Sequence, residues 1–173
     1  DPFRVGDALP AGVAAAASPA ETARWDRLVA AAGALLAHAG PDLAAEVAGT
    51  LHTLVPLRPV AACQGSSATA TDSLGAALLS PPSSPLALAA SLVHESAHSR
   101  LEMVHDLAAL VSEAAGHGDL YFSPWRPDPR PLAAVLQGTF AHARMAAFWA
   151  ARWTRRSPAA DPHAAYEFAW CRE

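Results

Sequence analysis

Two histidines and a glutamate in the stretch SLVHESAHSRLEMVHD have the types and the spacing of a metal site. His94, Glu95 and His98 form the pattern HExxH. On an α-helix, residues four apart lie about 6 Å apart along the axis and about 40° apart around it. Both imidazoles can therefore bind one metal ion, each at about 2 Å. The same pattern occurs in zinc peptidases, in which the glutamate is the general base.

A third ligand has to come from elsewhere, because the rest of this helix supplies none within reach. Glu102 and His105 lie about 12 and 16 Å along the axis from His94, too far to share one ion with it. Glu113 follows on the same helix and points away from the site. Leu101 stands where the metzincin pattern HExxHxxGxxH requires glycine.

His142, in the stretch LQGTFAHARMAAFW, is the better candidate for the third ligand. It shares a helical face with Gly138 and Trp149. Glycine one turn before the histidine would let another helix approach closely. If the two long helices pack antiparallel, His142 faces His94 and His98. The alternative is an ordinary core or surface histidine.

Two arginines flank the start of the helix that carries His142. Arg126 lies in the stretch YFSPWRPDPRPL, and Arg130 is expected in the first turn of the helix. The planar guanidinium binds both oxygens of a carboxylate, and a helix N-terminus adds unpaired N–H groups and positive potential. A carboxylate receptor beside the metal is one interpretation. The other is that Arg130 only pairs with Asp128.

Five helices are predicted from cap and proline signals and from apolar residues at helical spacing. They cover residues 19–40, 41–55, 84–115, 128–155 and 161 onward. Residues 57–82 lack a helical stripe, so this segment is predicted to be extended, with short strands at 60–63 and Ala76–Leu79. The sequence thus predicts a mainly α domain in which two long, antiparallel helices carry the metal ligands.

The helix pattern indicates a single domain over residues 1–173, with an N-terminal helical hairpin at 19–55 and the metal-binding helices with their connecting loop at 84–155. The last helix stops at Glu173 without a C-cap, about three turns after it begins. We therefore expect a missing C-terminal portion.

Charge and composition limit the classes of partner. The net charge of −4 and the lack of a basic run argue against nucleic acid or an anionic membrane as the main partner. Cys63 and Cys171 are the two cysteines and lack zinc-site spacing, so we expect free thiols in a reducing compartment. The chain has no lysine, asparagine or isoleucine, which suggests a GC-rich bacterial genome and a cytoplasmic protein.

Three stretches together resemble one protein family. LVHESAHSRLEMVHDLA, SPWRPDPRPL and LQGTFAHARMAAFW, in this order and spacing, resemble the HExxH-type proteins of bacterial gene clusters for ribosomally made, post-translationally modified peptides. The segment SSATATDSLGAALLS is similar to the family's approach to its motif. The resemblance covers residues 55–173, and the family usually extends beyond the point where this chain stops.

The resemblance implies an iron(II)- and 2-oxoglutarate-dependent β-hydroxylase that acts on a precursor peptide. It implies iron ligands at His94, His98 and His142, with zinc possible in place of iron. It also implies that Arg126 or Arg130 holds the carboxylate of 2-oxoglutarate, and that Glu95 orients a ligand or a bound water. A three-histidine site would depart from the two-histidine, one-carboxylate set of most such oxygenases.

Two other functions remain open from the sequence. In a zinc metallopeptidase, Glu95 would be the general base, and the metal would polarise water and the scissile carbonyl. A non-catalytic peptide-recognition partner would keep a relic of the metal site. The peptide substrate and the oligomeric state are not determined by the sequence.

Overall fold

The computed structural model describes residues 18–57, 67–69, 74–112, 119–155 and 161–171. It is mainly α-helical, as the sequence predicts. The helices are α1 (Pro19–Ala39), α2 (Pro41–Thr50), α3 (Pro85–Leu107), α5 (Leu132–Arg155) and α6 (Pro162–Trp170). None of these helices is long and apolar enough to cross a membrane.

The predicted helix starts that depend on a cap followed by proline are confirmed for three helices. At the start of α1, the Ser18 side chain accepts from the backbone N–H of Glu21, and the Glu21 carboxylate accepts from the backbone N–H of Ser18. Ser84 caps α3 in the same way through the N–H of Ala87. At the start of α6, Asp161 Oδ1 accepts from the N–H of Ala164 at 3.0 Å.

Three short strands form a small sheet next to α3. They are β1 (Thr53–Pro56), β2 (Ser67–Thr69) and β3 (Ala76–Leu79), in the order β1-β3-β2, with β1 parallel and β2 antiparallel to β3. The predicted strand Ala76–Leu79 is thus confirmed, whereas the one at 60–63 falls outside the described residues. The prediction that the second helix reaches residue 55 is wrong, because residues 53–56 pair with β3 instead.

The segment before α5 is a β-hairpin, which the sequence analysis did not predict. Strand β4 (Leu120–Ser123) pairs antiparallel with β5 (Arg126–Pro131). The predicted helix start at Asp128-Pro129 is therefore wrong, and Arg130 lies on a strand rather than in the first helical turn. In the sequence RPDPRP every second residue precedes a proline, and a residue in that position is disfavoured in the α region. The helix is therefore disfavoured up to Arg130, and it begins at Leu132.

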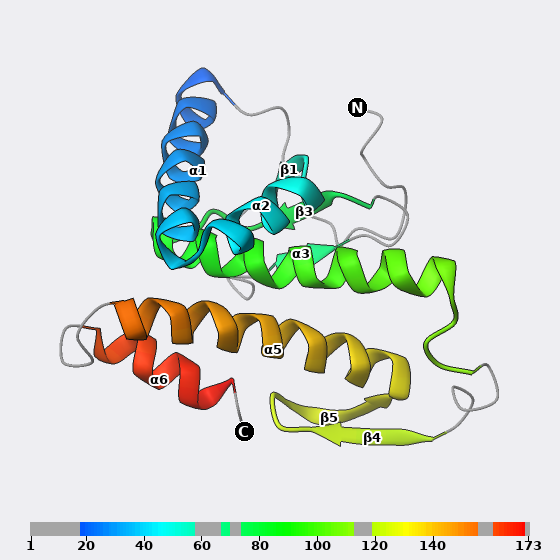
Figure 1. Cartoon of the computed structure of the whole chain (residues 1–173). Helices are drawn as coiled ribbons and strands as arrows, with labels where there is room; N and C mark the ends of the chain where they lie inside the picture. Colours follow the sequence, from blue (N-terminus) through cyan, green and yellow to red (C-terminus); the bar gives the residue numbers. More distant parts are fainter. Residues whose placement is uncertain (1–17, 58–66, 70–73, 113–118, 156–160, 172–173) are drawn as a thin grey trace.

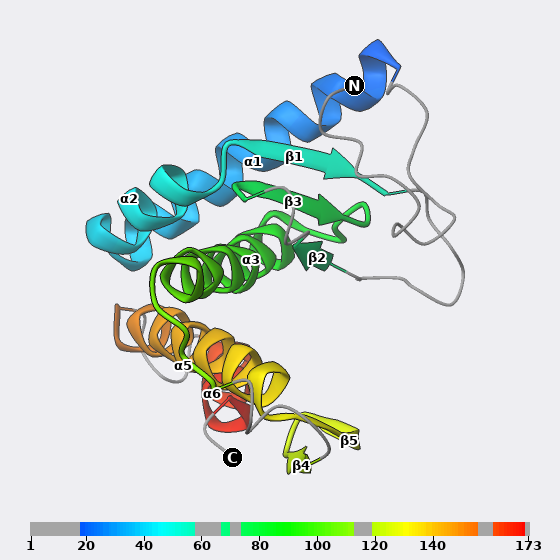
Figure 2. The same cartoon turned by 90° about the vertical axis from the view of Figure 1, so that its right-hand side faces the viewer.

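The helix α3 runs through the middle of the molecule. Figures 1 and 2 show α1, α2 and the small sheet on one side of it, and α5 with α6 and the hairpin on the other. The helices α3 and α5 lie side by side and run antiparallel (Figure 1), as predicted. α3 ends at Leu107 instead of near residue 115. The core between these layers contains Leu36, Leu88, Val93, Phe148 and Trp149.

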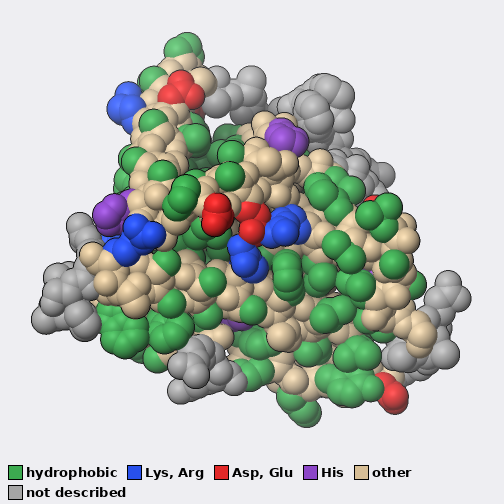
Figure 3. All heavy atoms as spheres, viewed as in Figure 1, with side chains coloured by type: hydrophobic (Ala, Val, Ile, Leu, Met, Phe, Trp, Pro, Cys, Tyr) green, Lys and Arg blue, Asp and Glu red, His purple; other side chains and the backbone are tan. Residues whose placement is uncertain are grey.

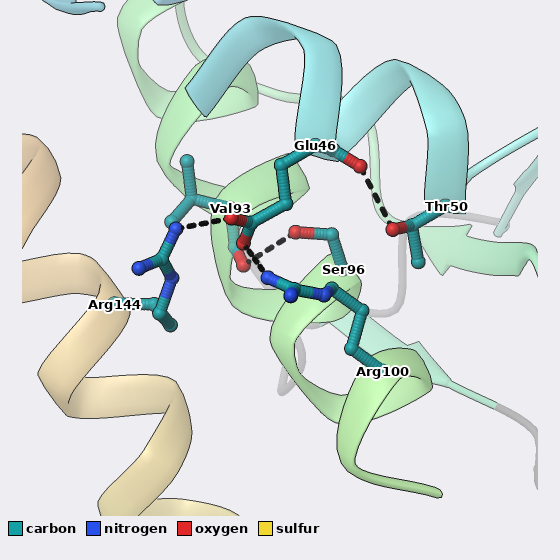
Figure 4. A network of polar contacts seen from close by, with 6 residues as sticks. All are labelled: Glu46, Thr50, Val93, Ser96, Arg100 and Arg144. Carbon is teal, nitrogen blue, oxygen red and sulfur yellow. Dashed lines mark hydrogen bonds and ion pairs between the residues drawn. The ribbon is translucent and has the colours of Figure 1, made fainter. Parts of the chain in front are cut away.

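A carboxylate on α2 joins the two long helices. Glu46 forms ion pairs with Arg100 of α3 and Arg144 of α5 (Figure 4). Figure 3 shows acidic and basic side chains gathered in the middle of this face, among apolar and uncharged surface. Arg100 is two residues after His98, and Arg144 is two residues after His142, so on each helix about 200° separates arginine from histidine. The ion pairs therefore stabilise the register of α3 against α5 from the face opposite the histidines.

Candidate metal centre

The HExxH histidines point the same ring nitrogen at each other. The Nε2 atoms of His94 and His98 are 3.1 Å apart, with the ring centroids 4.7 Å apart and the planes at 77°. Two imidazoles bound to one ion at about 2.1 Å, with an angle of about 90° to 110° between them, would have their Nε2 atoms about 3.0 to 3.4 Å apart. The two side chains on α3 therefore already fit adjacent positions around one ion.

His142 of α5 faces this pair from across the helix interface. Its ring centroid is 6.0 Å from that of His94, with the planes at 82°. Two imidazoles in adjacent positions on one ion would have centroids about 5 Å apart, so the His142 ring has to approach by about 1 Å to complete the set. In the positions that the described residues take, no three or more histidine, cysteine, aspartate and glutamate side chains form a group that could hold a metal ion.

Hydrogen bonds give two of the histidines a defined tautomer. Nδ1 of His142 is 2.8 Å from the carbonyl oxygen of Gly138, which can only accept, so Nδ1 carries the proton and Nε2 keeps its lone pair. Nδ1 of His98 is 3.0 Å from Oε1 of Gln137, which gives the same result. In the neutral form of either ring the lone pair is then on Nε2, the atom that would bind a metal.

Gly138 has a different neighbour from the one predicted. A Cβ atom built on Gly138 would lie 2.7 Å from Nε1 of Trp125 and 2.9 Å from its Cε2. The glycine thus admits an indole from the hairpin and not, as expected, a second helix. Trp125 in turn stacks on the His142 ring, with centroids 4.4 Å apart and planes at 18°. The hairpin therefore fixes the plane of the third histidine.

One cavity of about 480 Å³ contains the three histidines and one of the two arginines. Its lining is His94, His98, Ser123, Trp125, Arg130, Ala134, Gln137, Gly138, His142 and Trp170. No aspartate or glutamate is part of this lining, so the candidate donors among its described residues are three imidazoles and not two imidazoles with a carboxylate. A set of three imidazoles leaves positions on an ion free for other ligands.

Arg130 pairs with Asp128 and also lines the cavity. It lines the cavity from β5, and its Nη1 is 3.2 Å from Oδ2 of Asp128, with both side chains close to half exposed. That contact engages only one nitrogen of the guanidinium fork, which has five N–H groups. Arg130 can therefore still present N–H groups to an anion. The side chain of Arg126 is outside the part of the chain that the structure describes.

The described glutamates of α3 are not part of the lining of the histidine cavity. Glu95 is 1% exposed, within the interior, and is not among the residues that line the cavity. Glu102 and His105 line a smaller cavity of about 200 Å³ farther along α3. Glu113 is outside the described residues. The role predicted for Glu95, as a general base or as a residue that orients a ligand or a bound water, therefore stays a prediction.

The helix α6 forms the remaining wall of the site. Trp170 lines the cavity and lies 5.5 Å, centroid to centroid, from His142. Nε of Arg152 on α5 is 2.7 Å from Oδ2 of Asp161, the residue that caps α6. The Nε–H bond is not directed at that oxygen, so the attraction is chiefly electrostatic. Cys171, just after the helix, is a free thiol as predicted, and burial raises its pKa to about 11; Cys63 is outside the described residues.

No protein-family model matches this chain, and no curated protein matches it. The assignment of a function therefore depends on the site itself.

Burial and the neighbouring His98 and His142 lower the pKa of His94 to about 4, against the usual 6.5. Between these two values the unfolded chain binds a proton that the folded chain does not, so stability falls as the pH falls and is unaffected above about pH 7. We expect the metal-free protein to lose about 2 kcal/mol of unfolding free energy from this residue between about pH 7 and pH 5.

Urea titrations of the metal-free wild type and of His94→Gln at both pH values measure this loss. The variant lacks the group, so its unfolding free energy is expected to fall less over the same pH interval. Equal losses in the two proteins would contradict the predicted origin of the effect.

Gln137 is one of the cavity residues that the sequence analysis missed. It is five residues before His142, which places it about 140° around α5 from that histidine. Helical periodicity thus gives no reason to group the two. Trp125 and Trp170 were also missed, because their positions depend on the hairpin and on α6.

Proposed function

We propose that this chain is an iron(II)- and 2-oxoglutarate-dependent oxygenase that β-hydroxylates residues of a ribosomally made precursor peptide. One observation supports this proposal most strongly: three imidazoles and the guanidinium of Arg130 line the same cavity. The resemblance of the HExxH, PWRPDPRP and QGTFAH stretches, which contain these four residues, to the peptide-modifying family also supports it.

Each cavity residue has a defined part in this proposal. His94, His98 and His142 would hold the ion through their Nε2 atoms and leave the opposite positions free for 2-oxoglutarate and dioxygen. Arg130 would bind the distal carboxylate of 2-oxoglutarate with its free N–H groups. When bound, iron and 2-oxoglutarate would supply an oxidant that can remove hydrogen from an unactivated carbon.

The overall reaction balances with these components. Dioxygen takes up four electrons: two come from the conversion of 2-oxoglutarate to succinate and carbon dioxide, and two come from the C–H bond that becomes C–OH. One oxygen atom enters succinate and the other enters the peptide. Trp125 and Trp170 would shield this chemistry from bulk water, because both indoles line the cavity.

The arrangement of Glu95 disfavours the metallopeptidase. A general base has to lie within hydrogen-bond reach of the water it activates, directly or through one further water. Glu95 is buried and outside the cavity lining. A non-catalytic peptide-binding function would not need an arginine beside the histidines.

Anaerobic titration of 2-oxoglutarate into the iron(II)-loaded protein tests the proposal through the visible metal-to-ligand charge-transfer band. In Arg130→Gln we expect the affinity for 2-oxoglutarate to fall by about 10- to 100-fold, since a charge-assisted hydrogen bond contributes about 1.5 to 3 kcal/mol. Iron affinity should stay within about twofold, because Arg130 is not a ligand.

Arg155→Gln, at the exposed end of α5, is the matched control and should leave both affinities unchanged. If the 2-oxoglutarate affinity of Arg130→Gln is unchanged, a residue other than Arg130 binds the carboxylate. A wild type that shows no band but retains zinc against a chelator would contradict the oxygenase and favour the peptidase.

A further inference from the structure

A chain of hydrogen bonds connects a carboxylate on α3 to one of the candidate ligands through a side chain on α5. Nε2 of Gln137 is 2.8 Å from Oε2 of Glu102. On the other side of the same amide, Oε1 of Gln137 is 3.0 Å from Nδ1 of His98. Glu102 is one helical turn beyond His98, so the amide of Gln137 bridges two residues on one face of α3.

The carboxylate of Glu102, at one end, sets the donor-to-acceptor direction of every hydrogen bond in this chain. A carboxylate accepts hydrogen bonds and does not donate them, so the NH₂ group of Gln137 must face Glu102. The carbonyl oxygen of the same amide then faces His98 and can only accept. Nδ1 of His98 must consequently carry the proton. The orientation of the amide and the tautomer of the imidazole follow from one fixed acceptor.

The tautomer matters because of where the other nitrogen points. Nε2 of His98 is the atom directed at Nε2 of His94, 3.1 Å away. A neutral imidazole carries its proton on either nitrogen, and only the form with an unprotonated Nε2 can bind a metal through that atom. The chain also restrains rotation of the ring, because Nδ1 is tied to an amide that is itself tied to Glu102.

We propose that Glu102 and Gln137 are positioning residues of the metal centre, which hold His98 in the tautomer and the orientation that present Nε2 to the ion. This inference rests on the proposed metal site. Glu102 is too far along the axis from His94 to share a metal ion with it. This distance does not exclude a positioning role, because the carboxylate acts on His98 through the amide of Gln137. Partners of this kind typically contribute about 10- to 100-fold to metal affinity.

A neighbouring histidine supplies the matched control. His105 lines the same small cavity as Glu102 and Gln137. Its Nδ1 accepts from the backbone N–H of Leu110 at 3.2 Å, so this nitrogen binds the segment just after α3 and takes no part in the chain of hydrogen bonds. His105→Gln therefore changes a polar side chain next to the proposed positioning residues without changing their contacts to His98.

The first measurement is the anaerobic affinity for iron(II) alone, with zinc(II) as a competitor. Gln137→Leu removes both hydrogen bonds while keeping the shape of the side chain, and we expect an affinity about 10- to 100-fold weaker. Glu102→Gln leaves an amide that can donate or accept, so the direction is no longer fixed, and we expect a loss of about 3- to 10-fold. His105→Gln should bind as the wild type does.

The double variant E102Q/Q137E separates positioning from structural damage. The amide now on α3 would donate to one oxygen of the carboxylate now on α5, and the other oxygen of that carboxylate would accept from Nδ1–H of His98. The hydrogen bonds that lead to His98 thus keep a fixed direction, although the amide and the carboxylate have exchanged helices. We expect an affinity within about threefold of the wild type, well above that of Gln137→Leu.

The second measurement uses no metal and reads the tautomer directly. Nitrogen-15 NMR of histidine side chains in the metal-free protein should show His98 protonated at Nδ1 in the wild type and in E102Q/Q137E. In Gln137→Leu the Nε2-protonated form should appear. A variant that had merely lost stability would not change the tautomer of one histidine while the other spectra stayed the same.

The outcomes distinguish this inference from the proposed function. Wild-type protein that binds iron(II), together with Gln137→Leu that binds it equally well and keeps Nδ1–H on His98, would overturn the positioning role and leave the metal site intact. Wild-type protein that binds neither iron(II) nor zinc(II) would overturn the metal site, and the NMR spectra would then report whether the hydrogen-bond chain exists without it.

Discussion

Replacing His94 by alanine is expected to abolish stoichiometric metal binding while leaving the helical content mostly intact. A structural zinc site with four ligands has an apparent binding free energy of about 10 to 16 kcal/mol, or about 3 to 4 kcal/mol for each ligand. The loss of one ligand therefore weakens binding by about 100- to 1,000-fold. The side chain lies on the α5-facing side of α3, and alanine favours the helix, so the fold should persist.

The measurement is metal content after dialysis together with circular dichroism of the same samples. His105→Ala, farther along α3, is the control and should retain the metal. Full occupancy of His94→Ala would disprove the site. His142→Ala adds a finer test, because its ring is 6.0 Å from that of His94. A loss as large as that of His94→Ala identifies a third ligand, whereas a loss below about tenfold identifies a residue that only lines the cavity.

The second large effect is expected at Asp161, far from the histidines in the sequence. Asp161→Ala removes the cap of α6 and leaves Arg152, whose side chain is 11% exposed, without its carboxylate. Breaking a buried ion pair by removing one partner costs about 3 to 5 kcal/mol, and the loss of an N-cap costs about 1 kcal/mol. The Nε–H group is not directed at the carboxylate, so we expect the lower end, about 4 kcal/mol in total.

Urea unfolding of Asp161→Ala and Asp161→Asn at neutral pH measures this effect. Asparagine can still accept from the N–H of Ala164, so it retains the cap and loses only the charge. The asparagine variant should therefore be more stable than the alanine variant by about 1 kcal/mol. A loss below about 1 kcal/mol in Asp161→Ala would show that the pair does not hold α6 in place.

Holding α6 in place has a consequence for the candidate site. The helix carries Trp170, which lines the histidine cavity next to His142. If α6 detaches in Asp161→Ala, the cavity opens to solvent on that side. In the fraction of Asp161→Ala that stays folded, we expect the free energy of metal binding to fall by less than the free energy of unfolding does. The reason is that the three histidines are on α3 and α5.

The candidate ligands could be found from the sequence because they depend on local geometry. The spacing of His94 and His98 places both on one helical face in any fold that keeps the helix. The pairing with His142 required one assumption, that α3 and α5 pack antiparallel. The start of α5 was also encoded locally, in three residues that each precede a proline, although the sequence analysis assigned the helix one turn too early.

Contacts between separate elements could not be obtained in this way. Trp125 fills the space beside Gly138, Gln137 bridges Glu102 to His98, and Glu95 is buried. Helical periodicity states which residues share a face, but not which neighbour covers that face or how far two helices are rotated against each other. The neighbour that covers each face and the rotation of the two helices are set by the packing of the hairpin, the sheet and α6 around α3 and α5. Local sequence signals therefore locate most helix starts and place His94 and His98 on one helical face, whereas long-range packing brings His142 opposite them and selects the side chains that surround and orient all three.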